Sequence, residues 1–288
     1  MPIKIPNDLP AAATLQSENI FVMPETRAVT QDIRPLEILI LNLMPTKIVT
    51  ETQFARLLGN TPLQVHLEFL HTRSHVATHV SAEHLFTFYK TFDEVRDRRY
   101  DGMIITARPW SSCRLRTSST GRSCAASWTG AGRMCTARCI SAGARRAALY
   151  HHYGIEKVPL EKKLFGVFPH RVEYKNPILL RGFDDVFMVP HSRHTTVRRE
   201  DIERVPELKI LASSEQAGVY AIFTAGGRQI FLTGHAEYDP DTLRREYERD
   251  KALGLPIAVP ENYFPGNDDT KPPLVTWRST PTCCSRTG

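Results

Sequence analysis

Cysteine, lysine and acidic residues are missing from parts of this 288-residue chain where an ordinary protein would contain them. Cysteine is absent outside two stretches, 107–146 and 280–288, which hold all 6 cysteines. This clustering argues against a disulfide framework for the whole molecule. The first stretch also has no lysine and no acidic residue, although it contains 8 arginines. Such a composition does not suit a buried strand and helix.

Long apolar runs are also missing. No run reaches the 18 or so residues of a membrane-spanning helix, and the start, MPIKIPNDLP, lacks the apolar centre of a secretory signal. The sequence therefore predicts a cytoplasmic protein without a membrane partner. Because we find no internal repeat and no linker, we expect a single domain over 1–288 with one large core.

The net charge of +6 comes from the arginines of one stretch, 107–146. Without the 8 arginines of 107–146, the chain has 29 basic and 31 acidic residues, so most of the surface does not favour nucleic acid. A non-enzymatic, nucleic-acid-binding pseudoenzyme stays as an alternative. Its DNA affinity would fall steeply with salt and would vanish when these arginines are removed.

The rest of the chain alternates apolar strands with amphipathic helices. The segment 35–45 is a continuous apolar run that ends at a proline, and 46–60 then spaces apolar residues along one helix face. This alternation predicts an α/β fold with a mostly parallel sheet covered on both faces. The other predicted elements are strands at 63–70 and 100–107, a hairpin at 218–235 and a charged helix at 241–254.

His235 and Glu237 stand two residues apart where an apolar strand ends. Side chains at such spacing in an extended segment point the same way, so both can face one pocket. A carboxylate beside an imidazole fixes its tautomer, which is what a base that activates a serine or cysteine needs. A solvated pair at a strand end is the alternative reading of this short motif.

Four further groups of polar residues have weaker patterns. Lys47 stands where strand-to-helix loops of open sheets meet ligands, although a surface lysine has the same pattern. A donor-rich strand-end loop at 191–194 suits an anionic ligand, with a plain exposed loop as the alternative. We expect His71, His75, His79 and His84 to be loop histidines and not a metal site, because no carboxylate or cysteine is interleaved before Glu83. The pair His151 and His152 is expected at a helix end, in a packing or solvent-facing role and not a catalytic one.

Several long motifs resemble the homoserine O-acyltransferases of methionine biosynthesis. They are MPIKIPNDLPA, ENIFVM, LNLMPTKIVTETQ, FYKTFDEV, YDGMIIT, AALYHHYGI, FGVFPH, VPHSRH and LTGHAEYD. The resemblance implies a fold like that of class I glutamine amidotransferases and a Cys-His-Glu triad. In this family the nucleophile lies in the segment His-Ile-Cys-Trp-Gly-Ala-Gln, just before the part that matches AALYHHYGI, which places the cysteine at position 142.

The chain has Ala142 there, and a shifted reading frame explains the difference. Residues 139–146 can be encoded TGC ATA TCT GCT GGG GCG CGC AGG. Read from one base earlier, after a C, this gives Leu-His-Ile-Cys-Trp-Gly-Ala-Gln. The same shift turns 107–113 into Gly-Ala-Pro-Val-Glu-Gln-Leu and 280–288 into His-Ala-Asn-Leu-Leu-Phe-Ser-Asn-Trp. We therefore expect apparent frameshifts over about 107–146 and 280–288, in the gene or in its sequencing.

The resemblance also implies residue roles in the chain with its frame restored. The cysteine at position 142 attacks acyl-CoA, His235 acts as general base and Glu237 orients it, and homoserine then opens the acyl-enzyme. Lys163, Ser192 and Arg249 would bind substrate, and Lys47 would support the oxyanion. At the donor-specificity position the chain has Ser111, whereas the shifted frame reads glutamate, which would repel a succinyl carboxylate and favours acetyl-CoA over succinyl-CoA.

These roles lead to further expectations. The partners are L-homoserine and acyl-CoA, without nucleic acid, membrane, metal or cofactor other than acetyl-CoA as co-substrate, and a homodimer is left open. As printed, the chain should be inactive for want of a thiol and should fold poorly, because a core strand and helix are scrambled. A glutaminase, which would share the triad, is the second alternative.

Overall fold

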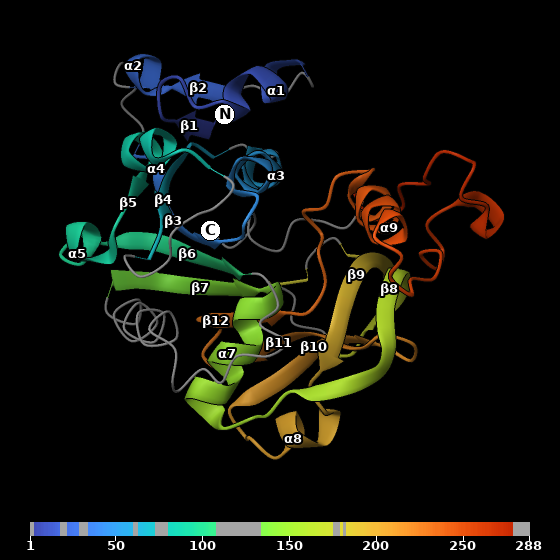
Figure 1. Ribbon diagram of the computed structural model, residues 1–288. Coiled ribbons are helices and arrows are strands. Elements are labelled where there is room, and N and C mark those ends of the chain that lie inside the picture. Colours follow the sequence, from blue (N-terminus) through green and yellow to red (C-terminus); the bar gives the residue numbers. More distant parts are fainter. Residues whose placement is uncertain are drawn as a thin grey trace.

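The computed structural model describes residues 3–17, 22–28, 34–59, 63–72, 80–107, 134–174, 179–180 and 183–278. Across these residues one 12-stranded sheet carries helices on both faces (Figure 1). The strands are β1 (Ile3–Ile5), β2 (Val22–Pro24), β3 (Leu36–Leu43), β4 (Val65–Leu70), β5 (Tyr89–Lys90), β6 (Tyr100–Ala107), β7 (Cys135–Ser141), β8 (Val158–Val172), β9 (Val186–Thr196), β10 (Leu208–Ser214), β11 (Gly218–Thr224) and β12 (Gln229–Leu232). The helices are α1 (Ala11–Ser17), α2 (Glu25–Ala28), α3 (Lys47–Gly59), α4 (Ala82–Phe88), α5 (Phe92–Val95), α7 (Ala142–Tyr153), α8 (Arg199–Glu203) and α9 (Thr242–Ala252), with a 3₁₀ turn at Pro265–Asn267.

The first half of the sheet is parallel. The strand order is β2-β1-β4-β3-β6-β7-β12-β11-β10-β8-β9, with β5 added beside β4. Every pairing among β1 to β7, and that of β7 with β12, is parallel. The predicted strands at 35–45, 63–70 and 100–107 and the helix at 46–60 are confirmed as β3, β4, β6 and α3, each within a few residues of its expected ends.

Alternating residues of the parallel strands pack into two cores on opposite faces. Leu39, Leu41 and Ile105 lie in one cluster with Leu149 of α7, whereas Ile40 and its neighbours on the other face pack against α3. A helix on each face explains why these strands are mostly apolar and do not alternate with polar residues, since both of their faces are buried. The predicted α/β architecture is confirmed.

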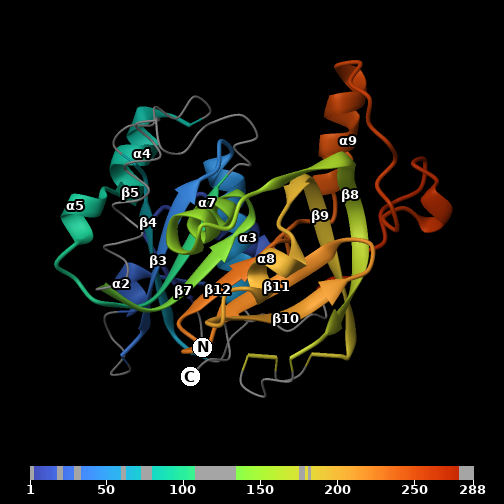
Figure 2. The same ribbon diagram turned by 90° about the horizontal axis from the view of Figure 1, so that it is seen from below.

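The second half of the sheet, from β12 to β9, is antiparallel. β11 and β12 form the hairpin predicted at 218–235, and β8 and β9 pair along most of their length. Both views place α9, the helix predicted at 241–254, beside the ends of β8 and β9 (Figures 1 and 2). Phe165 and Val167 of β8 pack there against Leu243, Tyr247 and the buried Trp277. In the part of the chain that is described, no helix is both long and apolar enough to cross a membrane.

The stretch 107–146, where we expect a frameshift, contains the whole of strand β7 and the start of helix α7. β7 ends at Ser141 and α7 begins at Ala142, which is the strand-to-helix junction where the nucleophile was expected. The described backbone of 134–146 thus has the strand and the helix start that the resemblance implies at this place. The reason is that Cys139 and Ile140 are small or apolar enough to be buried in the sheet, and the alanines that follow favour a helix. Residues 108–133 lie outside the described part.

Gly166 is the point at which β8 approaches the C-terminal segment most closely. Its backbone has φ +147°, and a Cβ there would lie 2.4 Å from the carbonyl oxygen of Glu261. Replacing Gly166 with alanine should lower the free energy of unfolding by at least about 2 kcal/mol, because backbone on both sides must move. Urea denaturation of Gly166→Ala against Gly226→Ala, where the added methyl meets nothing within 4 Å, checks this. Equal midpoints for the two variants would contradict the close approach.

Candidate active site

The carboxyl ends of the central parallel strands bring three of the predicted site positions to one edge of the sheet. Ser141 at the end of β7 pairs with Leu232 at the end of β12, so Ala142 and His235 follow neighbouring strand ends. Lys47 opens α3 after β3, which is two strands away from β7 with β6 between them. Ligands of open α/β sheets bind at this edge.

His235 and Glu237 form a buried hydrogen-bonded pair. The ring Nδ1 lies 2.7 Å from Glu237 Oε1, and the two side chains are only 7% and 9% exposed. Since a carboxylate only accepts, the neutral ring carries its proton on Nδ1 and keeps Nε2 as a free base. The alternative of a solvated pair at a strand end is therefore wrong. This arrangement suits a base that takes a proton from a thiol or a hydroxyl.

The segment before His235 is held against β9 by a close approach. The His235 amide donates to the carbonyl of Pro190 at 2.9 Å. A Cβ on Gly234 would lie 2.4 Å from Val189 Cγ1 and 3.0 Å from the ring of His191, so only glycine fits without movement. The imidazole of His235 is thus positioned by the backbone on one side and by Glu237 on the other.

The expectation of a strand-end loop at 191–194 is wrong. These residues lie inside β9, and His191, Ser192 and Arg193 are buried. They can be polar and buried because each finds a partner from another element. The Arg193 guanidinium donates to the carbonyl of Ala217, and His191 Nε2 lies 3.2 Å from His170 Nε2.

The three predicted substrate-binding residues meet around a carboxylate of α9. Lys163 donates from β8 to Glu246 Oε1 at 2.8 Å, and Ser192 donates to the same oxygen at 2.8 Å. Arg249 lies one turn further along α9, where its guanidinium contacts Asp250 at 2.6 Å and Glu246 at 3.8 Å. Burial alone would raise the pKa of Asp250, but hydrogen bonds from Arg249 and Lys163 lower it overall. The cluster offers both signs of charge, as binding of an amino-acid zwitterion requires.

Tyr238 connects the base to this cluster. Its ring stacks on that of His235 with centroids 4.1 Å apart. Burial, together with the charges of Glu246 and Glu237, raises the pKa of the Tyr238 phenol well above its ordinary value. Tyr238 therefore stays neutral and lies within electrostatic range of both carboxylates.

α3 is bound to the segment that follows His235. Arg56 forms an ion pair with Asp239, and Gln53 Nε2 donates to the other oxygen of that carboxylate at 3.3 Å. The helix that begins at Lys47 is thus bound to the chain that carries the base.

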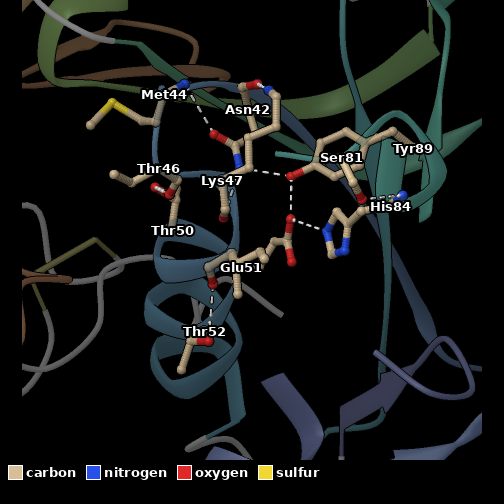
Figure 3. A network of polar contacts seen from close by, with 11 residues as sticks. Asn42, Met44, Thr46, Lys47, Thr50, Glu51, Thr52, Ser81, His84 and Tyr89 are labelled. Carbon is tan, nitrogen blue, oxygen red and sulfur yellow. Dashed lines mark hydrogen bonds and ion pairs between the residues drawn. The ribbon is translucent and has the colours of Figure 1, made fainter. Parts of the chain in front are cut away.

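Lys47 is not the surface lysine that one interpretation allowed. It is 2% exposed, and its ammonium donates to the carbonyl of Asn42 (Figure 3). Burial lowers the pKa of this ammonium to about 8, against the opposing effect of the Glu51 carboxylate. The expectation that His84 is a loop residue is also wrong, because it lies in α4 with its ring 3.0 Å from Glu51.

Some predicted positions lie outside the described residues, and some important residues had not been predicted. The predicted positions outside the described residues are Ser111, His75 and His79. Sequence reasoning missed Glu246 and Asp250, although Glu246 stands three residues before Arg249 and four before Asp250, a spacing that places Glu246 next to each of them on α9. Among the described residues, no group of three histidine, cysteine or acidic side chains is placed to hold a metal ion.

Comparisons with known proteins identify the family and the fold of this chain. A family model described as homoserine O-succinyltransferase matches residues 2–284. A homoserine O-acetyltransferase of Acetivibrio thermocellus is 58% identical over 96% of this chain and 91% of the relative, and one of Brevibacillus brevis is 54% identical over 97% and 91%. A glutamine amidotransferase structure from Thermotoga maritima superposes with a TM-score of 0.54 at 11% identity, over 77% of this chain and 84% of that one. The expected class I glutamine amidotransferase-like fold is confirmed.

Proposed function

Because this chain belongs to the homoserine O-succinyltransferase family, we propose that, with its reading frame restored, it transfers an acetyl group from acetyl-CoA to the hydroxyl of L-homoserine. The observation that carries the proposal is the buried pair of His235 and Glu237, which lies at the strand end next to the junction of β7 and α7. A cysteine at position 142 would stand at the first residue of α7, where helix amides favour negative charge.

The reaction proceeds in two half-reactions through a covalent acyl-enzyme. His235 Nε2 takes the thiol proton, the thiolate attacks the carbonyl carbon of acetyl-CoA, and the CoA sulfur leaves with that proton. Homoserine then enters, Nε2 accepts the proton of its hydroxyl, and the oxygen attacks the thioester. The cysteine sulfur leaves and takes that proton from Nε2, which releases O-acetylhomoserine and restores the thiol. Amides of the first turn of α7 and the ammonium of Lys47 stabilise the oxyanion in both steps.

The polar cluster at α9 binds the amino acid. The Arg249 guanidinium suits the homoserine carboxylate. Lys163 and Ser192 donate to Glu246 and hold that side chain in place beside Arg249. The distances within the cluster and the contact of Tyr238 with His235 support a continuous site from the base to this cluster. The protein acts without a resident metal or cofactor in this proposal.

Acetyl-CoA is the proposed donor, although the family description names succinyl transfer. The relatives at 58% and 54% identity are named acetyltransferases, and the shifted frame gives glutamate at position 111. The restored chain should therefore show kcat/KM at least about 10-fold higher with acetyl-CoA than with succinyl-CoA, because like charges repel in a desolvated pocket. Release of CoA thiol with each donor, at saturating homoserine, measures this. Equal or better use of succinyl-CoA would contradict the assignment.

The same preparation separates acyl transfer from the glutaminase alternative. Ammonia release from glutamine should stay at background, whereas acetyl-CoA and homoserine together should release CoA. Ammonia released without any acyl transfer would instead favour the glutaminase.

A further inference from the structure

A buried polar cluster lies on the α3 side of the carboxyl edge of the sheet (Figure 3). Its members are Asn42, Lys47, Glu51, His84 and Tyr89, and we refer to it as the Tyr89 cluster. All five are buried, and all lie outside 107–146, so they are the same in the printed and the restored chain. Apart from Lys47, none has a role in the reaction described above.

The donors and acceptors of the cluster can be assigned. Glu51 Oε1 accepts from the Tyr89 hydroxyl at 2.6 Å and from His84 Nε2 at 3.0 Å. The Tyr89 oxygen in turn accepts from the amide nitrogen of Asn42 at 2.9 Å. The phenol has one proton, which it donates in the hydrogen bond to Glu51, so its oxygen can only accept from Asn42. Glu51 therefore fixes the orientation of Tyr89, and Tyr89 fixes that of Asn42.

Lys47 is held by the same two residues. Its ammonium donates to the backbone carbonyl of Asn42 and lies 5.0 Å from the centre of the Tyr89 ring. The Asn42 side-chain amide also donates to the backbone carbonyl of Lys47 at 3.3 Å. Figure 3 shows these contacts converging on the turn between β3 and α3.

We propose that Tyr89 is a positioning residue for Lys47: its hydroxyl, oriented by Glu51, fixes Asn42, and Asn42 and the Tyr89 ring together hold the Lys47 ammonium at the carboxyl edge of the sheet. The inference rests on the proposed acyl transfer, in which Lys47 supports the oxyanion. Neither Tyr89 nor Glu51 touches the substrate in this scheme.

Two observations favour a role in positioning over one in stability alone. Glu51 Oε2 is buried and has no hydrogen-bond partner within the described part of the chain, which a cluster built only for stability would avoid. The ammonium is also close to its titration point, because burial lowers the pKa of Lys47 to about 8 while Glu51 raises it. Within the described part of the chain, the Tyr89 phenol and His71 after β4 also face it, and the pKa of His71 is itself lowered by burial and by the charge of Lys47.

Replacing Tyr89 with phenylalanine in the restored chain tests the proposal. The variant keeps the ring but loses the hydroxyl, so Asn42 is released and kcat should fall about 10-fold, while KM for homoserine stays within about twofold. The matched control is Tyr100→Phe. Tyr100 begins β6, and the variant removes a hydroxyl that donates to the buried carboxylate of Glu68. That control should leave kcat unchanged. Equal kcat values for the two variants would overturn the proposal.

A second variant separates this inference from the acyl-transfer proposal. Glu51→Gln removes the charge that raises the Lys47 pKa, so the alkaline limb of the kcat profile should move down by about 1 pH unit. NMR titration of Lys47 in the chain as printed should show the same change, and Glu68→Gln should show none. If the restored chain is inactive, the proposed function fails, and an unchanged Lys47 titration in Glu51→Gln would overturn the positioning role independently.

Discussion

Restoring the reading frame of 107–146, so that a cysteine stands at position 142, is expected to raise acetyl transfer to homoserine by at least about 10⁴-fold in kcat. The physical reason is that His235 and Glu237 are already paired and buried, but Ala142 gives them no thiol to activate. CoA release by the two purified chains, with acetyl-CoA and L-homoserine, measures the difference. The restored chain should also become labelled by radioactive acetyl-CoA when homoserine is left out.

The matched control is the restored chain with serine in place of that cysteine. It keeps every other restored residue, so its inactivity would assign the gain to the thiol and not to better folding. Turnover by the chain as printed would contradict the prediction. So would genomic sequence that reads without a shift and still encodes Ala142.

Loss of the base or of its orienting carboxylate should also have a very large effect. In the restored chain, His235→Asn should lower kcat by roughly 10⁵-fold, because no group remains to take the thiol proton. Glu237→Gln should cost about 10³- to 10⁴-fold, since a glutamine can donate to Nδ1 and force the proton onto Nε2, where the base is needed. Steady-state kinetics over a range of pH gives both numbers.

Glu248→Gln provides the control for the carboxylate. Its side chain is 65% exposed on α9 and faces Arg244 at 4.0 Å, so the change should leave kcat within about twofold. A Glu237→Gln variant with nearly full activity would mean that the buried pair does not orient the base.

The sequence predicted the parallel half of the fold because its signals there are local. The runs 35–45 and 100–107 are mostly apolar, since helices cover both faces of β3 and β6, and such runs are recognisable without knowing their partners. The junction at Ala142 was different. Its place came from resemblance, because its printed neighbours have no motif of a nucleophile.

Residues whose partners are distant in sequence were harder to interpret. Ser192 and Arg193 looked like a polar loop, yet they lie in a strand because Glu246 and the Ala217 carbonyl satisfy their hydrogen bonds. The burial of Lys47 was equally hard to predict, since the residues that bury it come from β3 and β5. No spacing rule within one element connects such groups, so the polar part of the site could not be assembled from local pattern.

The two attachments of α3 mean that one rigid helix connects two parts of the proposed site. Its first residue, Lys47, is the proposed oxyanion support, and Arg56 forms an ion pair with Asp239, which follows His235. The span between them is set by the rise of a helix, about 1.5 Å per residue, and not by flexible loops. Thermal motion should therefore move Lys47 and the segment after His235 together, so that their separation stays nearly constant.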